Sequence, residues 1–293
     1  MSRRPEWWMN VLKIFWPLTE LSARATQWPV VGWLFSRASL PLFTGRNFNI
    51  SYIPINKTIQ GIKNILIPDM VLEELIRRSS HRVIIKRCTC RDHHKCKNHP
   101  IENACIMLGE GAAEIDPRVA RHVSVDEAIS HMKRQVNDGL IPMAGRVRMD
   151  DFFWGVRNRD QLLTVCFCCR CCCTVMRSTQ YFPQEANNSI VRLQGLSINV
   201  DSEKCTGCGG CVEDCFAMAI SLIEEKAVHS EEKCKGCGRC VSLCPQNAVS
   251  VMVADVDAAA REMISRIESI IDFEFGSERN PRSELSGKRA NTE

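Results

Sequence analysis

Eighteen cysteines dominate the chemistry that this 293-residue sequence can support, and they fall into four tight groups. The two C-terminal groups repeat one pattern: three cysteines, each separated from the next by two residues, then a fourth after three more. The eight are Cys205, Cys208, Cys211 and Cys215, followed by Cys234, Cys237, Cys240 and Cys244. A spacing of two curls the backbone so that thiolates and amide N–H groups face one centre, which is typical of [4Fe-4S] clusters. Zinc ribbons also use such pairs, but they seldom need the whole run twice.

The segment from about 196 to 254 resembles bacterial two-cluster ferredoxins at these residues. The resemblance implies a ferredoxin-like (βαβ)2 domain in which the fourth ligand of each cluster comes from the other run. Cluster one then takes Cys205, Cys208, Cys211 and Cys244, and cluster two takes Cys234, Cys237, Cys240 and Cys215. That family places a proline after the fourth cysteine. Pro245 keeps this pattern and Phe216 departs from it, so we expect cluster two to keep its ligands but to differ in packing and potential.

Glycines lie between the cysteines of both runs, among them Gly207 and Gly236. They let the chain bend tightly around a cluster, and we expect nearby amide groups to donate hydrogen bonds to sulfur. Such donors stabilise the reduced, more negative state of a cluster.

The other ten cysteines also gather too closely for isolated structural roles. They are Cys88, Cys90, Cys96 and Cys105 in one group, and Cys166, Cys168, Cys169, Cys171, Cys172 and Cys173 in the other. Thiolates this dense repel one another and oxidise readily, and a bound metal neutralises them. We therefore predict that the two groups jointly bind one or two further iron–sulfur clusters, or one cluster of unusual nuclearity. Zinc is the alternative for the first group, because His93, His94 and His99 lie among its cysteines.

Strand-like stretches lead into both of these groups. Residues 81–86 run into Cys88-Thr-Cys90-Arg, and residues 162–165 run into Cys166-Phe-Cys168-Cys-Arg. Two neighbouring parallel strands would end at the same edge of a sheet and bring both groups into one crevice.

Four parts are expected along the chain: residues 1–46, a cysteine-rich α/β domain over 47–195, the ferredoxin-like domain over 196–254, and a C-terminal helix with a polar tail over 255–293. The predicted fold class is therefore α+β or α/β. Within the cysteine-rich domain we expect strand structure over 53–67 and helices over 68–78 and 100–108. A further helix follows a capping box that begins at Ser124. The tail from 276 has the composition of a disordered segment.

The N-terminal segment, residues 1–46, differs from the rest of the chain in charge and aromatic content. It holds five of the six tryptophans, and its six basic and two acidic residues account for the whole net charge of +4. Prolines 17 and 29 predict two or three short amphipathic helices. No apolar run is long enough to span a bilayer, so the segment is expected to lie on a membrane surface or to dock onto a protein. A twin-arginine export signal is a weaker alternative, because charges interrupt the apolar stretch.

Composition excludes several classes of protein. Outside residues 1–46 the charges balance, which argues against a nucleic-acid-binding surface. Clustered cysteines in a chain of this length indicate reduced thiols and a cytoplasmic protein, peripheral on the inner face of the cell membrane if residues 1–46 bind lipid. The sequence also contains no dinucleotide-binding or P-loop motif.

The expected function is electron transfer. The cysteine-rich region resembles iron–sulfur subunits of anaerobic oxidoreductases, which implies a subunit of a larger complex that relays single electrons between a soluble redox protein and a membrane-surface acceptor. One alternative is a reductase whose catalytic cluster is held by the Cys88–Cys105 and Cys166–Cys173 groups and supplied by the ferredoxin domain. A third, less favoured alternative is a protein of cluster delivery or reductive activation, which would lose a labile cluster to an acceptor protein.

Overall fold

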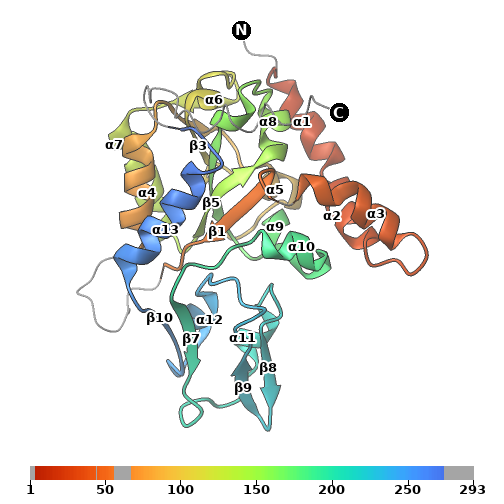
Figure 1. Ribbon diagram of the computed structural model, residues 1–293, viewed down its shortest axis with the longest axis vertical. Helices are drawn as coiled ribbons and strands as arrows, with labels where there is room; N and C mark the ends of the chain where they lie inside the picture. The colour runs from red at the N-terminus through yellow and green to blue at the C-terminus, as the bar shows by residue number, and fades with distance from the viewer. Residues whose placement is uncertain (1–3, 44, 56–66, 274–293) are drawn as a thin grey trace, which may run out of the picture.

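The computed structural model describes residues 4–43, 45–55 and 67–273. Most of the strand predicted over 53–67 and the polar tail from 276 lie outside these residues. The described chain forms a large upper part that contains the cysteine-rich groups and a smaller lower part that contains the two ferredoxin-like runs (Figure 1).

The large part is built on one six-stranded sheet with the strand order β1-β5-β6-β3-β2-β4. Each neighbouring pair of strands is antiparallel. The strands are β1 (Phe48–Tyr52), β2 (Arg82–Ile85), β3 (Ile106–Leu108), β4 (Ala120–His122), β5 (Ile141–Val147) and β6 (Leu163–Cys168). Together with the surrounding helices, this sheet confirms the predicted α+β class.

The two strands that lead into the cysteine groups are not neighbours, so the prediction of a parallel pair is wrong. β3 lies between β2 and β6 and is antiparallel to both. Since two strands antiparallel to a third run in the same direction, β2 and β6 still end at one edge of the sheet. The prediction of a helix over 100–108 is also wrong, because hydrogen bonding to both neighbours makes Ile106–Leu108 a buried strand.

Three amphipathic helices cover one face of the sheet: α4 (Ile67–Arg78), α7 (Val125–Asn137) and α13 (Val256–Glu268) (Figure 1). Their apolar stripes share a core with strands β2, β3 and β6. α7 begins with the predicted capping box, in which Ser124 and Glu127 exchange hydrogen bonds. Because α13 follows the ferredoxin-like part and packs beside α4, the chain returns to the large part after leaving it.

The remaining helices of the large part are short. They are α5 (Thr89–His94), α6 (Glu110–Ala113), α8 (Arg148–Trp154), α9 (Thr174–Ser178) and α10 (Gln184–Asn188), with 3-10 turns η1 (Leu40–Leu42), η2 (Arg159–Gln161) and η3 (Thr179–Tyr181). α5 and α9 matter most here, because each begins next to a cysteine at the sheet edge.

The lower part repeats one β-α-β unit, as the ferredoxin resemblance implies. The first unit contains β7 (Leu196–Val200), α11 (Gly210–Glu213) and β8 (Ile220–Ile223), and the second contains β9 (Lys226–His229), α12 (Arg239–Leu243) and β10 (Val249–Val253). β7 pairs with β10, and β8 with β9, both antiparallel. Because the first strand, β7, pairs with the last, β10, the two cysteine runs lie next to each other.

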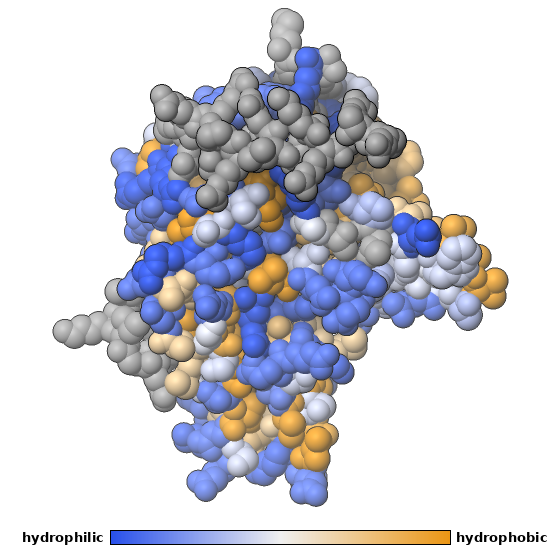
Figure 2. Space-filling view, viewed as in Figure 1, coloured by the Kyte–Doolittle hydropathy of each residue, from blue (hydrophilic) through white to orange (hydrophobic). Residues whose placement is uncertain are grey.

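The N-terminal segment forms three helices broken near the predicted prolines: α1 (Trp7–Phe15), α2 (Pro17–Ala25) and α3 (Gly32–Ser39). Met9 and Leu12 enter a core cluster that also contains Trp154, so the segment packs on its own chain. Its outer face is apolar and exposed, and Figure 2 shows such side chains in orange at the tip of this segment. No helix in the described ranges is long and apolar enough to cross a membrane.

Candidate metal centres

The ten cysteines outside the ferredoxin-like part meet at one edge of the sheet, where they separate into two groups. Seven line an apolar cavity, and six of these are called the cavity cysteines: Cys88, Cys90, Cys105, Cys166, Cys168 and Cys173; the seventh, Cys169, also belongs to the group described next. The other four form a compact group, called the Cys96 quartet: Cys96, Cys169, Cys171 and Cys172. All ten are free thiols. Each group thus combines residues from both parts of the sequence.

Strand register explains how the cavity cysteines come together. β2 leads into Cys88 and Cys90, β6 carries Cys166 and Cys168, and β3 between them begins just after Cys105. Ile106 pairs with Val165, which places Cys105 opposite Cys166, and their sulfurs are 3.0 Å apart. Because β3 runs in the opposite direction, its beginning lies at the edge where the other two strands end.

Two further close pairs complete this group. The Sγ atoms of Cys168 and Cys173 are 3.2 Å apart, and the thiols of Cys88 and Cys90 are hydrogen-bonded. The cavity has a volume of about 420 Å³, within the range of ligand-binding pockets. Its walls also include Trp16 and Phe35 of the N-terminal segment, which therefore covers the cysteines from one side.

The charges of these thiols are strongly perturbed. A hydrogen bond from Cys90 lowers the pKa of Cys88 to about 6, and the neighbouring Arg91 acts in the same direction. The hydrogen bond to Cys105, together with burial, raises the pKa of Cys166. The apolar cavity therefore holds negatively charged thiolates with little solvation. The positive charge of a metal cluster bound there would neutralise them.

Two charged side chains that the sequence pattern did not indicate belong to this site. Arg91 is buried, and its Nη2 donates a hydrogen bond of 2.6 Å to the carbonyl of Phe167. Asp150 lines the cavity and accepts a hydrogen bond of 2.7 Å from Thr164. Burial raises the pKa of Asp150 to about 7, so this carboxyl exchanges a proton near neutral pH.

The ferredoxin-like cysteines line two small cavities that match the implied ligand sets. Cys205, Cys208, Cys211 and Cys244 surround one. Cys215, Cys234, Cys237 and Cys240 surround the other, at whose edge Cys211 also lies. In both, the fourth cysteine comes from the other run, which is the arrangement of two-cluster ferredoxins. The residues present therefore fit two [4Fe-4S] clusters.

Backbone amides point at the ferredoxin-like sulfurs as expected. Ala227 donates to Cys205 Sγ at 3.4 Å, Ala248 to Cys244 Sγ at 3.2 Å, and Gly236 to Cys234 Sγ at 3.3 Å. Gly207 has a φ of +69°, and a Cβ there would lie 2.2 Å from the carbonyl oxygen of Glu225. Glycine is therefore required at 207 for the chain to pass between the first run and the β8–β9 hairpin.

Two aromatic rings connect the second ferredoxin-like site to the cavity. Phe216 is buried, and its ring centroid lies 5.1 Å from that of Tyr52 on β1. Tyr52 shares a core cluster with Cys168, Cys173 and the partly buried Cys237. Burial and these thiolates raise the pKa of Tyr52, so its hydroxyl stays protonated. The sequence indicates this contact only through the absence of proline at 216. No sequence pattern indicates that Tyr52 is the partner.

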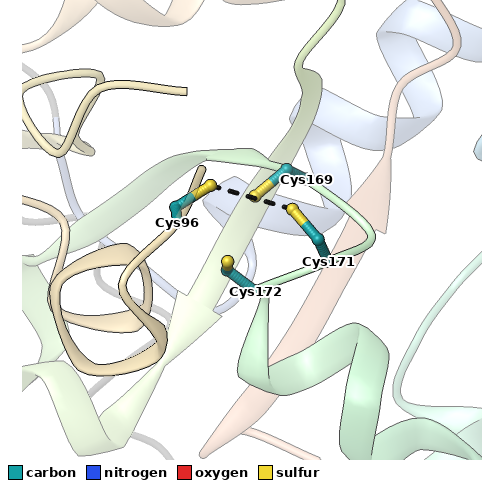
Figure 3. Close-up of side chains that lie close together, drawn as sticks. All are labelled: Cys96, Cys169, Cys171 and Cys172. Atoms are coloured by element: carbon teal, nitrogen blue, oxygen red, sulfur yellow. Dashed lines mark hydrogen bonds between the residues drawn. The ribbon is translucent and has the colours of Figure 1, made fainter. Parts of the chain in front are cut away.

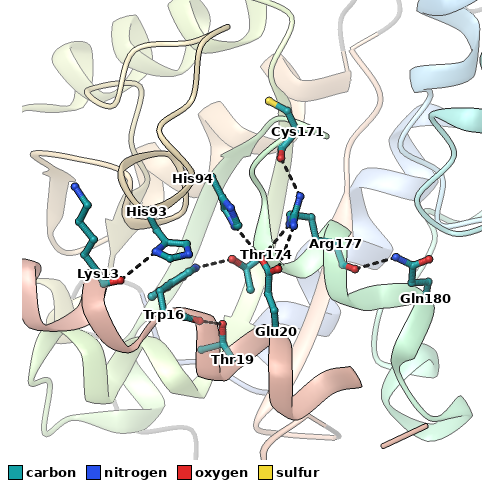
Figure 4. Close-up of polar contacts among 10 residues, drawn as sticks. All are labelled: Lys13, Trp16, Thr19, Glu20, His93, His94, Cys171, Thr174, Arg177 and Gln180. Carbon is teal, nitrogen blue, oxygen red and sulfur yellow. Dashed lines mark hydrogen bonds and ion pairs between the residues drawn. The ribbon is translucent and has the colours of Figure 1, made fainter. Parts of the chain in front are cut away.

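The histidines near the first cysteine group bind the N-terminal segment (Figure 4). Nδ1 of His93 lies 3.0 Å from the carbonyl oxygen of Lys13, and Nε2 of His94 lies 2.8 Å from Oε1 of Glu20. Glu20 also forms an ion pair with Arg177. His93 and His94 therefore hold α1 and α2 in place, and none of the three histidines joins the group of metal-ligand atoms found in the described part of the chain.

Comparison with known proteins agrees with the lower part of the molecule. A family model described as a 4Fe-4S binding domain matches twice, over residues 198–221 and 227–250. No curated protein matches the chain. The two matches and the eight cysteines show a two-cluster ferredoxin-type domain, so this is an iron–sulfur electron-transfer protein.

Proposed function

We propose that the chain relays single electrons between a soluble redox protein and an acceptor at a membrane surface, as the iron–sulfur subunit of an anaerobic oxidoreductase complex. The observation that carries this proposal is the direct packing of the cavity site against the ferredoxin-type domain through Tyr52 and Phe216. Iron–sulfur clusters bound by thiolates exchange single electrons at potentials set by their protein surroundings. A dense set of exposed and half-buried thiols also favours an anaerobic setting.

Three sites in series would make one path through the molecule. The cluster-one cysteines lie beside the β8–β9 hairpin, whereas Cys237 of cluster two shares a core cluster with Tyr52 of the large part. From Cys237 the path continues through the Tyr52 and Phe216 rings to Cys168 and Cys173. The third centre is assigned to the cavity cysteines, as one of the further iron–sulfur clusters expected from sequence.

Exposed apolar side chains lie at both ends of this path. The β8–β9 hairpin exposes Leu222, Ile223 and Val228, and Leu222 also lines the cluster-one cavity. We assign this end to a soluble redox protein, because an apolar patch beside a redox centre suits transient docking. At the other end α1–α3 expose tryptophans and aliphatic residues, and Phe35 reaches from that surface into the cavity wall. We assign this end to lipid.

Iron and acid-labile sulfide per chain test the third centre. The protein is purified without oxygen and compared with Cys105→Ser and Cys166→Ser, with Cys208→Ser as the matched control. We expect more iron than the roughly 8 atoms of two [4Fe-4S] clusters. The cavity variants should lose iron and sulfide while keeping the EPR signals of the ferredoxin-type domain, and the control should lose one of those signals. About 8 iron atoms, unchanged by the cavity substitutions, would sink the proposal.

A second candidate function is a reductase that binds its substrate in the cavity. The volume of about 420 Å³ favours this candidate, because a purely electron-transferring centre needs no such space. EPR of the reduced protein with and without cyanide separates the two. A changed cavity signal indicates iron with an open coordination position, whereas an unchanged signal indicates iron capped by thiolates alone.

A further inference from the structure

The Cys96 quartet is more compact than any other group of metal-ligand side chains in the described part of the chain. Its four sulfurs all lie within 4.8 Å of one another, and those of Cys96 and Cys171 are 3.8 Å apart (Figure 3). Cys169 and Cys172 are buried, whereas Cys171 is exposed. Figure 3 shows Cys96 facing the other three, which come from the turn after β6.

We infer that this quartet binds one tetrahedrally coordinated divalent metal ion and takes no part in an iron–sulfur cluster. A zinc–sulfur bond of about 2.3 Å places the sulfurs of a regular tetrahedron about 3.8 Å apart. The separation of Cys96 and Cys171 equals this edge. Four thiolates in tetrahedral arrangement suit Zn²⁺ or a single iron ion.

The ferredoxin-type domain provides an internal comparison. In a [4Fe-4S] cluster each cysteine binds a different iron atom, so the four sulfurs stand around the cluster and remain apart. The two ferredoxin-like quartets accordingly do not gather within the distance that unites the Cys96 quartet, although all eight of their residues are described. The cavity cysteines form close pairs instead of a foursome. Among the residues that the structure describes, only the Cys96 quartet has the spacing of a site for one ion.

Backbone N–H groups surround the sulfurs as they do in metal–thiolate sites. The amides of Asn98 and His99 donate to the sulfur of Cys96, and the amide of Cys172 donates to that of Cys169. Such donors orient thiolates and spread their charge, which fixes the ligands around an ion.

Two arginines offset the remaining charge. Four thiolates around a divalent ion carry a net charge of −2. The buried guanidinium of Arg91 is hydrogen-bonded to Cys169, and Nη1 of Arg177 donates to the carbonyl of Cys171 at 3.4 Å. The site is therefore electrostatically compensated from within the chain.

The position of the quartet gives the ion a structural task. Cys169, Cys171 and Cys172 lie in the turn whose two ends carry the cavity cysteines Cys168 and Cys173. Cys96 lies across from them, after α5. An ion bound here cross-links the two segments and holds the turn that positions Cys168 and Cys173.

The test is the count of zinc, iron and acid-labile sulfide in the wild-type holoprotein. [4Fe-4S] clusters contain equal iron and sulfide, so a zinc ion adds one zinc per chain, whereas a lone iron makes iron exceed sulfide by one. Either result supports the inference and identifies the ion. If the ion is zinc, X-ray absorption at the zinc edge should show sulfur neighbours alone, at about 2.3 Å. Equal iron and sulfide with no zinc would overturn the inference.

Cys171→Ser is the matching variant, because Cys171 is exposed and its replacement disturbs little packing. Cys208→Ser is the control, because Cys208 is also exposed. Cys171→Ser should lose the additional ion, and Cys208→Ser should lose iron together with sulfide but keep that ion. Retention of the ion in Cys171→Ser would place it elsewhere and contradict the assignment. The inference survives a failure of the electron-relay proposal, because the ion count does not depend on a cluster in the cavity.

Discussion

Trp16 is the side chain through which the N-terminal segment closes the cavity, and its removal should expose the cavity centre. Only 8% of its surface is exposed, and its ring packs 5.3 Å from that of Phe153. Its Nε1 donates a hydrogen bond of 2.6 Å to Oγ1 of Thr174, the residue after Cys173 (Figure 4). Trp16→Ala therefore removes both the apolar contact and the polar one.

The expected effect follows from burial. Truncating a buried tryptophan to alanine costs about 3–5 kcal/mol. The segment is an outer element, so we expect this cost to weaken docking of α1 and α2 before it unfolds the whole chain. A loss of about 3 kcal/mol raises the population of the undocked segment roughly a hundredfold, since each 1.4 kcal/mol is a factor of ten.

Two rates report this opening in the anaerobic holoprotein: removal of cavity iron by a chelator, and tryptic cleavage after Arg24. Trp33→Ala is the matched control, because 68% of Trp33 is exposed and the same side chain is removed without loss of burial. Its effect should stay within about 0.5 kcal/mol, roughly twofold. Equal rates in the two variants would refute the role of Trp16 as the closing contact.

Three further predictions concern single side chains. Asp150 loses its proton as the pH rises through about 7, which adds a negative charge beside the cavity. The midpoint potential of a cluster bound by the cavity cysteines should therefore fall by up to about 59 mV per pH unit. Asp150→Asn should abolish this slope in a potentiometric titration, and a slope kept in the variant would assign it to another group. Asp151→Asn removes the buried partner of Arg146, whose Nη1 donates to Oδ1 at 2.8 Å, and should cost about 3–5 kcal/mol in urea unfolding. A cost under about 1 kcal/mol would contradict the burial of this ion pair. Phe216→Pro restores the common ferredoxin residue and should keep both EPR signals of the ferredoxin-type domain. It should slow the reduction of the cluster bound by the cavity cysteines, measured by rapid mixing. Unchanged kinetics would exclude the Tyr52–Phe216 contact from the electron path.

Local sequence patterns predicted the ferredoxin-type domain because its ligands are set by short-range spacing. Two residues between cysteines dictate a tight curl whatever the rest of the chain does. The capping box at Ser124 is local in the same sense, and α7 begins there as predicted. Such features transfer directly from sequence to structure.

The partition of the other ten cysteines depends on long-range pairing and could not be read from spacing. Cys105 meets Cys166 only because β3 inserts between β2 and β6 with Ile106 opposite Val165. Cys96, grouped with Cys88 and Cys90 by sequence, belongs instead with cysteines more than seventy positions away. A shift of β3 by one residue would turn each of its side chains to the opposite face of the sheet. The thiols of Cys105 and Cys166 would then no longer meet in the cavity.

The N-terminal helices show another limit of periodicity. Trp7, Val11, Ile14, Leu18 and Leu21 recur at helical spacing, but all of these side chains except Val11, which is half-buried, are exposed. Met9 and Trp16, on the other side, are buried against the chain itself. When a helix is apolar on two sides, only the surface available on the rest of the molecule decides which side is covered.

The departure at 216 accounts for how the ferredoxin-type domain packs against the cysteine-rich part of the molecule. A proline there would fix the backbone and offer a small ring with no aromatic face. Phenylalanine instead reaches the Tyr52 ring and is buried between the two parts of the molecule. The residue that breaks the ferredoxin pattern is thus the one that makes the contact on which the proposed electron path depends.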